Sequence, residues 1–347
     1  MKGTALMLTM DVFRGDAFSA VSLTAAVDRM GYVPGFLGSI PGLMVDTPIR
    51  TTDVWIEERL NAPALIQTSP RGAPPAQKGG DRRKARSFRT VRLADSSRIY
   101  ADELQNIRAY GSETELKQLQ GEVARRQLKI KQDFDLTHEH MRLGVIQGLV
   151  VDADGSTITD WYDELGQSQD APFAFQFGSG AEDGAFLEQC NKVNRQVLRR
   201  LQGVGGTNVI VHAVVDDNWW DAMTKLPEVR ETYKYAMQAL QLQNDFMKAF
   251  SSFKYGNIMW HNYRGTDDSS TVAVPDMTAK FFPVGAGIFQ RALAPAEKFE
   301  FVNTLGQAEY SWMVPDLERD TYFDLEMYSY PLYVCTMPQA LQRGVAA

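Results

Sequence analysis

The sequence predicts an α+β fold, in which amphipathic helices and short strands occupy different stretches of the chain. Apolar residues recur at helical spacing after Ser112 and again after Phe186. Alternating polar and apolar residues mark strands near 51–56 and 87–93. Beyond Phe253 the pattern becomes short strands punctuated by proline and glycine. Helices and strands that segregate in this way favour an α+β arrangement over alternating βαβ units.

The composition is that of a folded protein. The chain has 347 residues, of which 44% are hydrophobic and 23% charged, so wholesale disorder is excluded. A net charge of −7 argues against general affinity for nucleic acid. The sequence lacks an apolar run of about 18 residues, so we expect no membrane partner. Cys190 and Cys335 are far apart in apolar settings, and we expect free, buried thiols.

The first fifty residues predict an arm. They combine apolar side chains with repeated breakers, such as Gly31, Pro34 and Pro41, and one short helix is expected near 22–29. A segment of this kind cannot pack a core of its own, yet it is too apolar to remain in water. We therefore expect residues 1 to about 50 to lie on a neighbouring subunit.

The next segment predicts an extended hairpin with a basic character. Strand-like runs at 51–56 and 87–93 flank a tip, 69–81, that is rich in proline and glycine. Between Arg71 and Arg98 nine basic residues oppose two acidic ones, although the whole chain is acidic. The asymmetry suggests a finger that meets an acidic surface, such as one on the next copy of the chain.

The finger provides the candidate contact residues. On the hairpin they are Arg82, Arg83, Lys84, Arg86 and Arg89, and their acidic counterparts are Asp316, Glu318 and Asp320. Two other interpretations remain open, a solvated loop and a contact with DNA. Phe88 is the only aromatic residue between Arg82 and Arg98, which is fewer than a single-strand binder uses for base stacking.

The strongest helical pattern begins at Ser112. Ser112 and Glu115 have the spacing of a capping box. A single apolar stripe follows, made of Leu116, Leu119, Val123, Ile130, Phe134, Met141 and Val145. A helix that continues to about Leu143 is a rod of about 45 Å. Gly121 is its weak point.

Several shorter elements follow. Asp154-Gly155 predicts the tight turn of a hairpin over 150–158. A second amphipathic helix has the buried face Phe186, Cys190, Val193, Val197 and Leu201. Gly203–Gly206 are expected to cap that helix and connect it to a strand at 208–215. Asp216 and Asp217 then cap a short helix, and another begins at Pro227.

Residues suited to catalysis do not gather in any known pattern. His138 and His140 would lie about 200° apart on a helix, so they do not form a zinc pair. His212 and His261 are expected to be structural. Asp152–Gly155 has the wrong spacing for a calcium loop and suits a turn. We therefore predict no catalytic, cofactor-binding or metal-binding residues, and no cofactor.

Three C-terminal segments resemble the phage lambda-type major capsid protein family. The first is Phe253–Gly265, which ends in Tyr-Arg-Gly, and the second is Ala279–Gly285, followed by Ala294-Pro295-Ala296. The third is Leu325–Leu341, similar to the closing strand and tail of that family, with Met337 in place of the usual basic residue. The resemblance covers nearly the whole chain, and the arm and hairpin match by layout only.

The resemblance implies the major capsid fold of tailed phages and herpesviruses. The implied parts are an N-terminal arm (1–51), an extended β-hairpin loop (52–103), a peripheral domain with a long spine helix (104–183), an axial domain (184–320) and C-terminal strands that return to the peripheral domain (321–347). It also implies a non-enzymatic subunit that self-assembles into hexamers and pentamers of an icosahedral shell around double-stranded DNA. Scaffolding, portal and decoration proteins are further expected partners. The expected location is the virion, and the host cytoplasm during assembly.

Two other functions remain as alternatives. An α/β enzyme such as a hydrolase would be a discrete monomer or small oligomer with a convergent polar site. A DNA-binding protein that used the basic hairpin would show steep, salt-dependent affinity for DNA. For the shell subunit we also expect that no large N-terminal scaffolding segment is removed, because only about fifty residues precede the hairpin.

Overall fold

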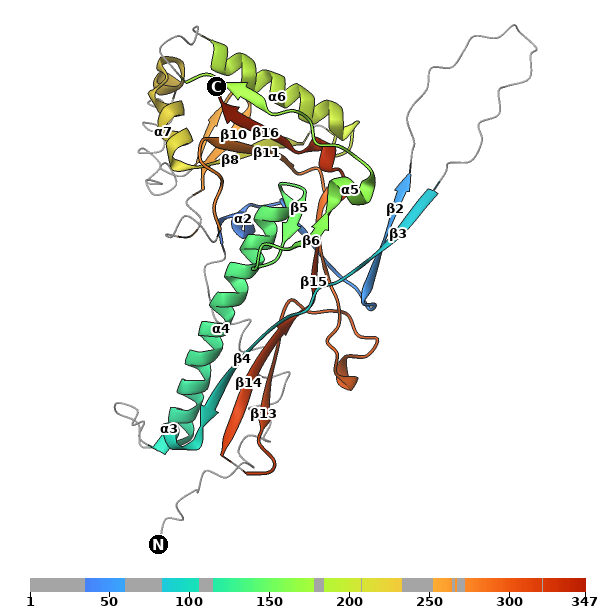
Figure 1. Cartoon of the computed structure of the whole chain (residues 1–347), viewed down its shortest axis with the longest axis vertical. Coiled ribbons are helices and arrows are strands. Elements are labelled where there is room, and N and C mark those ends of the chain that lie inside the picture. Colours follow the sequence, from blue (N-terminus) through green and yellow to red (C-terminus); the bar gives the residue numbers. More distant parts are fainter. Residues whose placement is uncertain are drawn as a thin grey trace, which may run out of the picture.

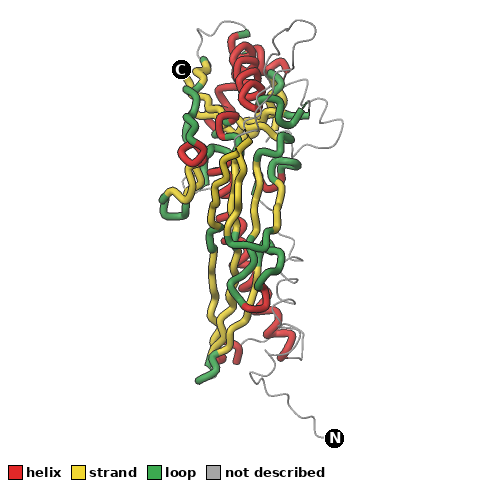
Figure 2. Tube along the Cα trace, turned by 90° about the vertical axis from the view of Figure 1, so that its right-hand side faces the viewer, coloured by secondary structure: helices red, strands yellow, loops and turns green. Residues whose placement is uncertain are grey.

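The computed structural model describes residues 35–59, 83–105, 115–177, 184–206, 208–232, 252–263, 266, 272–319 and 321–347. The molecule is elongated (Figure 1). At one end lies a six-stranded sheet with α6 (Ala185–Leu201) and α7 (Asp217–Lys225). The long helix α4 (Glu115–Val145) and a three-stranded sheet extend from there to the other end. Seen from the side, long strands follow the length of the molecule (Figure 2).

Helix α4 confirms the predicted spine. Its buried side chains Val123, Ile130 and Phe134 share one core cluster with Ile99, Phe323, Leu325 and Met327. Those four residues belong to an antiparallel sheet with the order β13 (Tyr310–Pro315), β14 (Tyr322–Ser329), β4 (Leu93–Tyr100). The predicted cap at Ser112 lies outside the described residues. The short helix α3 (Ala101–Gln105) follows β4.

The six-stranded sheet contributes several fully buried aromatic side chains to the main core, among them Phe175, Trp260 and Phe281. Its order is β7 (Phe173–Phe175), β16 (Gln342–Ala346), β11 (Thr278–Val284), β8 (Ile210–Val215), β10 (Ile258–Asn262), β9 (Ser252–Tyr255). Helix α6 buries all five of the residues predicted for its inner face. Helix α7 begins as predicted, because the Asp216 carboxylate accepts the N–H groups of Asn218 and Trp219. The helix from Pro227 is described as far as Thr232.

A third sheet connects the two ends of the molecule. Its order is β1 (Val45–Pro48), β12 (Phe289–Leu293), β15 (Pro331–Cys335). The helix α2 (Phe36–Ser39) packs on α4 just before β1. The expectation that residues up to about 50 leave their own subunit is therefore wrong for 36–48. The reason is that Leu37 and Leu43, 1% and 2% exposed, complete the main core. Residues 1–34 lie outside the described part.

The hairpin is formed by β2 (Asp53–Arg59) and β3 (Arg83–Arg89), paired antiparallel. The predicted hairpin is thus present, and its two strands project from the rest of the molecule (Figure 1). The predicted tip, 69–81, lies outside the described residues. The run 87–93, however, is not one strand. The Val91 N–H bonds the carbonyl of Pro331, which diverts the chain, and β4 then pairs with β14. The predicted range 52–103 thus includes one strand of another sheet.

The remaining elements complete the core. The predicted hairpin is β5 (Leu149–Val151) with β6 (Thr157–Asp160), and Gly155 in its turn has a φ of +84°. The helix α5 (Trp161–Leu165) and the 3-10 turns η3 (Phe299–Phe301) and η4 (Pro338–Ala340) follow. Among the described residues, no helix combines the length and apolar character needed to cross a bilayer.

The sheets cross the predicted domain limits. The range 184–320 supplies strands to the six-stranded sheet and also to both three-stranded sheets, which contain β12 and β13. The range 321–347 likewise contributes β14, β15 and β16 to three different sheets. The division of the chain into domains stays a prediction.

Candidate subunit interface

The predicted basic residues lie along β3 and just before it. Arg83 and Lys84 are in β3, although their side chains are outside the described part, and so is the whole of Arg82. The Arg86 guanidinium lies 3.9 Å from the Glu164 carboxylate of α5, and both side chains are about half exposed, at 40% and 48%. Arg89 is exposed opposite Asp53. A long, exposed pair of this kind contributes little to stability.

The two faces of the hairpin differ. Val54, Ile56 and Phe88 turn toward the chain's own core, where the Phe88 ring lies 5.0 Å from that of Trp161. Trp55, between the two inward residues of β2, is 69% exposed. Large aromatic side chains on a projecting strand are typical of protein contacts. The hairpin base is therefore held by its own subunit, while Trp55 is available to another.

The acidic residues gather at the opposite end of the molecule, in the turn between β13 and β14 (Figure 1). The Asp316 carboxylate accepts the N–H groups of Glu318 and Arg319 at 3.1 and 3.3 Å, and the Thr321 hydroxyl at 3.2 Å. Desolvation opposes ionisation of Asp316, but these hydrogen bonds outweigh it, and the pKa falls below its usual value. Asp316 thus holds the turn. Glu318 is exposed, and Asp320 lies outside the described residues.

The structure does not bring the basic and acidic sets together within one chain. The hairpin projects near the six-stranded sheet, whereas the β13–β14 turn lies at the far end of α4 (Figure 1). The next acidic residue, Asp324, is also engaged, because it binds Arg98 through two bonds of 2.7 and 2.9 Å. Any pairing of the hairpin with the turn must therefore join two subunits.

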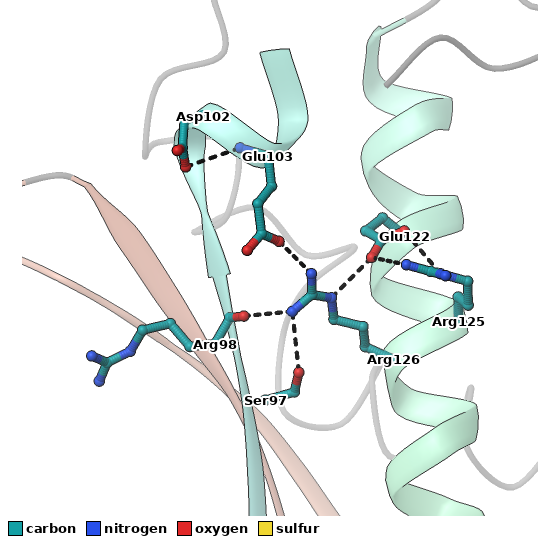
Figure 3. A network of polar contacts seen from close by, with 7 residues as sticks. All are labelled: Ser97, Arg98, Asp102, Glu103, Glu122, Arg125 and Arg126. Atoms are coloured by element: carbon teal, nitrogen blue, oxygen red, sulfur yellow. Dashed lines mark hydrogen bonds and ion pairs between the residues drawn. The ribbon is translucent and has the colours of Figure 1, made fainter. Parts of the chain in front are cut away.

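A polar network fastens α4 to the strands beside it (Figure 3). The Arg126 guanidinium donates to the Arg98 carbonyl at 2.5 Å, to Ser97 Oγ at 3.3 Å and to Glu122 at 2.9 Å, and it also bonds Glu103. Arg125 binds the same Glu122 carboxylate from the solvent side, where 74% of its side chain is exposed. The network holds α3, α4 and β4 together at this end of the molecule.

A buried carboxylate fastens the other end of α4. Glu139, 5% exposed, accepts the N–H groups of Leu37 and Gly38 at 2.6 and 3.3 Å. The Tyr263 hydroxyl lies 3.4 Å away, and Arg142 forms an ion pair of 3.3 Å. One side chain therefore connects α2, α4 and the loop after β10. The sequence pattern did not predict this role for Glu139.

Three of the four histidines, His138, His212 and His261, have structural surroundings. His212 Nδ1 lies 2.9 Å from His261 Nε2, and Ser252 Oγ lies 2.8 Å from His261 Nδ1. His138 is 1% exposed and its Nδ1 lies 2.9 Å from the Tyr333 hydroxyl. Burial lowers the pKa of all three rings. Within the described ranges, no group of three or more His, Cys, Asp or Glu side chains is placed to hold a metal ion.

A second exposed apolar surface, besides Trp55 of the hairpin, was not predicted from the sequence. The tip loop, residues 297–306, connects β12 to β13 and presents Phe299, Val302 and Leu305 to solvent. The sequence signal is weak, because the four apolar residues of this loop, Phe299, Phe301, Val302 and Leu305, do not show by themselves which side chains are buried.

Comparisons with known proteins identify the family. Residues 19–346 match the family described as phage major capsid protein E. The major capsid protein of Salmonella phage Felix O1 is 25% identical over 353 residues, covering 93% of this chain and 95% of that protein. The major capsid protein of Pseudomonas phage KPP10 is 26% identical over 346 residues, with coverages of 93% and 96%.

Solved structures show the same fold. The mature capsid of bacteriophage PhiM1 has a TM-score of 0.50 at 10% identity, covering 91% of this chain and 89% of that one. The capsid of cyanophage A-1(L) also has a TM-score of 0.50, at 12% identity, with coverages of 91% and 94%. The predicted fold of tailed-phage major capsid proteins is thus confirmed. The chain belongs to the phage major capsid protein E family, and it is a structural subunit of the phage shell.

Proposed function

We propose that copies of this chain assemble into hexamers and pentamers, which close an icosahedral shell around double-stranded DNA. The observation that carries the proposal is the β2–β3 hairpin, which projects from its own subunit with Trp55 69% exposed. The inward side chains of the strand pair hold its base on its own subunit, whereas the outward face with Trp55 can reach a neighbour. Contacts between different surfaces of identical subunits close into rings and shells when the geometry permits.

The regions of the chain have separate roles in this proposal. The arm and the hairpin contact neighbours, α4 with its three-stranded sheet forms the peripheral part, and the six-stranded sheet surrounds the centre of the capsomer. Assembly takes place in the host cytoplasm with scaffolding, portal and decoration proteins as partners. A net charge of −7 suits a container that must not bind the packaged DNA strongly.

The basic residues of the hairpin stabilise contacts between subunits. Arg82, Arg83, Lys84 and Arg86 meet acidic side chains on an adjacent copy, with Glu318 as the exposed acidic residue of the β13–β14 turn. Each exposed ion pair contributes only about 0.2–1 kcal/mol and is weakened by salt. Because the same gain recurs at every subunit boundary, the sum over a shell is large.

Reversing the four charges to Glu tests this role. The variant is expected to fold, because the core-facing side chains Val54, Ile56 and Phe88 of the hairpin are unchanged, but to form few particles. Circular dichroism measures folding and sedimentation measures assembly. A control variant with Lys192, Arg195, Arg199 and Lys225 changed to Glu alters the net charge equally at exposed positions elsewhere. Normal assembly of the hairpin variant at low salt would show that its basic residues are merely solvated.

A further inference from the structure

The tip loop is held in one conformation by its own subunit. Phe301, 7% exposed, packs against Tyr310 and Trp312 with ring centroids 4.9 and 6.0 Å apart. The Lys298 ammonium lies 3.9 Å above the Trp312 ring. Lys298 and Phe301, on either side of Phe299, are thus anchored to the aromatic cluster of Tyr310 and Trp312.

Backbone contacts close the loop at its other side. The Gly306 N–H donates to the Ile49 carbonyl at 2.9 Å, and the Thr304 hydroxyl donates to the Phe301 carbonyl at 2.8 Å. A Cβ at Gly306 would lie 2.0 Å from the Leu293 carbonyl oxygen, so this position accepts only glycine. The loop therefore depends on specific contacts and is not a loose connection.

This fixed loop exposes apolar side chains. Phe299 is 99% exposed, Val302 58% and Leu305 53%. A single exposed apolar residue is ordinary, but an anchored loop that exposes three of them presents an unusually apolar surface to water. An aromatic side chain on a preordered loop is the usual form of a binding anchor, because little entropy is lost when it docks.

We propose that the tip loop docks, through Phe299, Val302 and Leu305, on a second copy of this chain. The inference rests on the role of the chain as a shell subunit, because a shell surrounds each subunit with further copies. The loop lies on the same side of the molecule as the projecting hairpin, just below it in Figure 1, so both reach the neighbour on that side. The Arg92–Glu297 ion pair of 3.4 Å connects the loop to the short segment between β3 and β4, which follows the hairpin.

Thiol labelling tests the contact directly. The chain has two cysteines, Cys190 and Cys335, and both are buried, so a new surface cysteine is labelled selectively. The variant Phe299→Cys is labelled with a maleimide as dissociated subunits and as assembled particles. Ala153→Cys, in the exposed β5–β6 turn, is the control. It measures how much assembly alone slows the reaction of the maleimide with an exposed cysteine.

The expected result is that assembly slows labelling of Phe299→Cys at least about tenfold relative to Ala153→Cys. An unchanged ratio would overturn the proposal. So would protection that arises only when another virion protein is added, because the partner would then not be a second copy.

A second variant measures the contribution to assembly. Phe299→Ser with Val302→Ser should keep the thermal midpoint of the subunit, because both side chains are exposed, and should raise the concentration needed for assembly at least about tenfold. Wild-type particle formation is measured in parallel. If the wild type forms no particles, the proposed assembly into a shell is itself refuted. If both proteins assemble at the same concentration, only the docking of the tip loop is refuted.

Discussion

Arg125 and Arg126 are adjacent arginines with very different surroundings, although both bind Glu122. Arg126 is 22% exposed and connects α4 to β4 and α3, whereas Arg125 is 74% exposed. Removing Arg126 leaves Glu122, 7% exposed, and the Arg98 carbonyl with fewer partners. We expect Arg126→Met to lower the free energy of unfolding by about 2 kcal/mol, and Arg125→Met by less than about 0.5 kcal/mol. Urea denaturation of the soluble subunits measures both, and equal losses would refute the role of the network.

The His212–His261 pair predicts a pH dependence. Desolvation lowers the pKa of His212 to about 4 and that of His261 to about 3, whereas an unfolded histidine titrates near about 6.5. Between these values the unfolded chain binds more protons than the folded one. Stability is therefore complete above about pH 6.5 and falls as the pH decreases toward the folded pKa values.

We expect the free energy of unfolding to fall by on the order of 1 kcal/mol per buried histidine between about pH 6.5 and 5. His261→Gln should reduce this slope, because glutamine does not titrate, while His138 and His212 retain their share. Urea denaturation of unassembled subunits at each pH gives the measurement. A slope that is the same in both proteins would mean that His261 does not contribute to the titration.

At the scale of elements, two glycines of α4 have opposite surroundings. A Cβ at Gly121 would meet nothing within 4 Å, so alanine there adds helix propensity at no steric cost. A Cβ at Gly144 would lie 2.8 Å from the Leu149 carbonyl oxygen, where the chain folds back into β5. We expect Gly121→Ala to raise the free energy of unfolding by about 0.5–1 kcal/mol and Gly144→Ala to lower it. Thermal unfolding of both variants provides the comparison, and a destabilised Gly121→Ala would contradict it.

Elements with a clear period could be predicted from the sequence. The stripe of α4 from Val123 to Val145, the inner face of α6 and the turn at Gly155 all depend on local spacing, and the structure confirms them. The side chains of Leu116 and Leu119, at the start of the stripe, lie outside the described part. The break of the run 87–93 could not be predicted, because the Pro331 carbonyl that diverts the chain lies more than two hundred residues away. The role of Glu139 could not be predicted either, because its hydrogen-bond partners come from α2 and the loop after β10, far away in the sequence.

The candidate contact residues show the same limit. The cluster of basic residues in the sequence indicated that the hairpin is a distinct element. The charge pattern did not distinguish Asp316, whose carboxylate accepts hydrogen bonds within its own turn, from the exposed Glu318. Phe299 and Phe301 are two residues apart with the same side chain, yet one is 99% exposed and the other 7%. Only the tertiary contacts of the tip loop separate them.

At the scale of the whole molecule, the described chain has its own cores, and the main one begins at Leu37. Residues 35–48 belong to that unit, because α2 binds Glu139 and β1 pairs with β12. The arm before them is rich in apolar residues and in breakers, and we propose that it lies on adjacent subunits. The boundary between these two roles is therefore expected near residue 35.

Truncation on either side of that boundary tests the division. A variant that lacks residues 1–34 should keep its circular dichroism spectrum and its thermal midpoint within about 4 °C, because less than about 1 kcal/mol is lost. It should nevertheless sediment as subunits or small oligomers under conditions in which the full chain forms particles. A variant that lacks residues 1–44 also loses Leu37 and Leu43 and should be destabilised by at least about 2 kcal/mol. If removal of residues 1–34 already unfolds the subunit, the arm belongs to its own core; if particles form normally without it, the arm is not a contact between subunits.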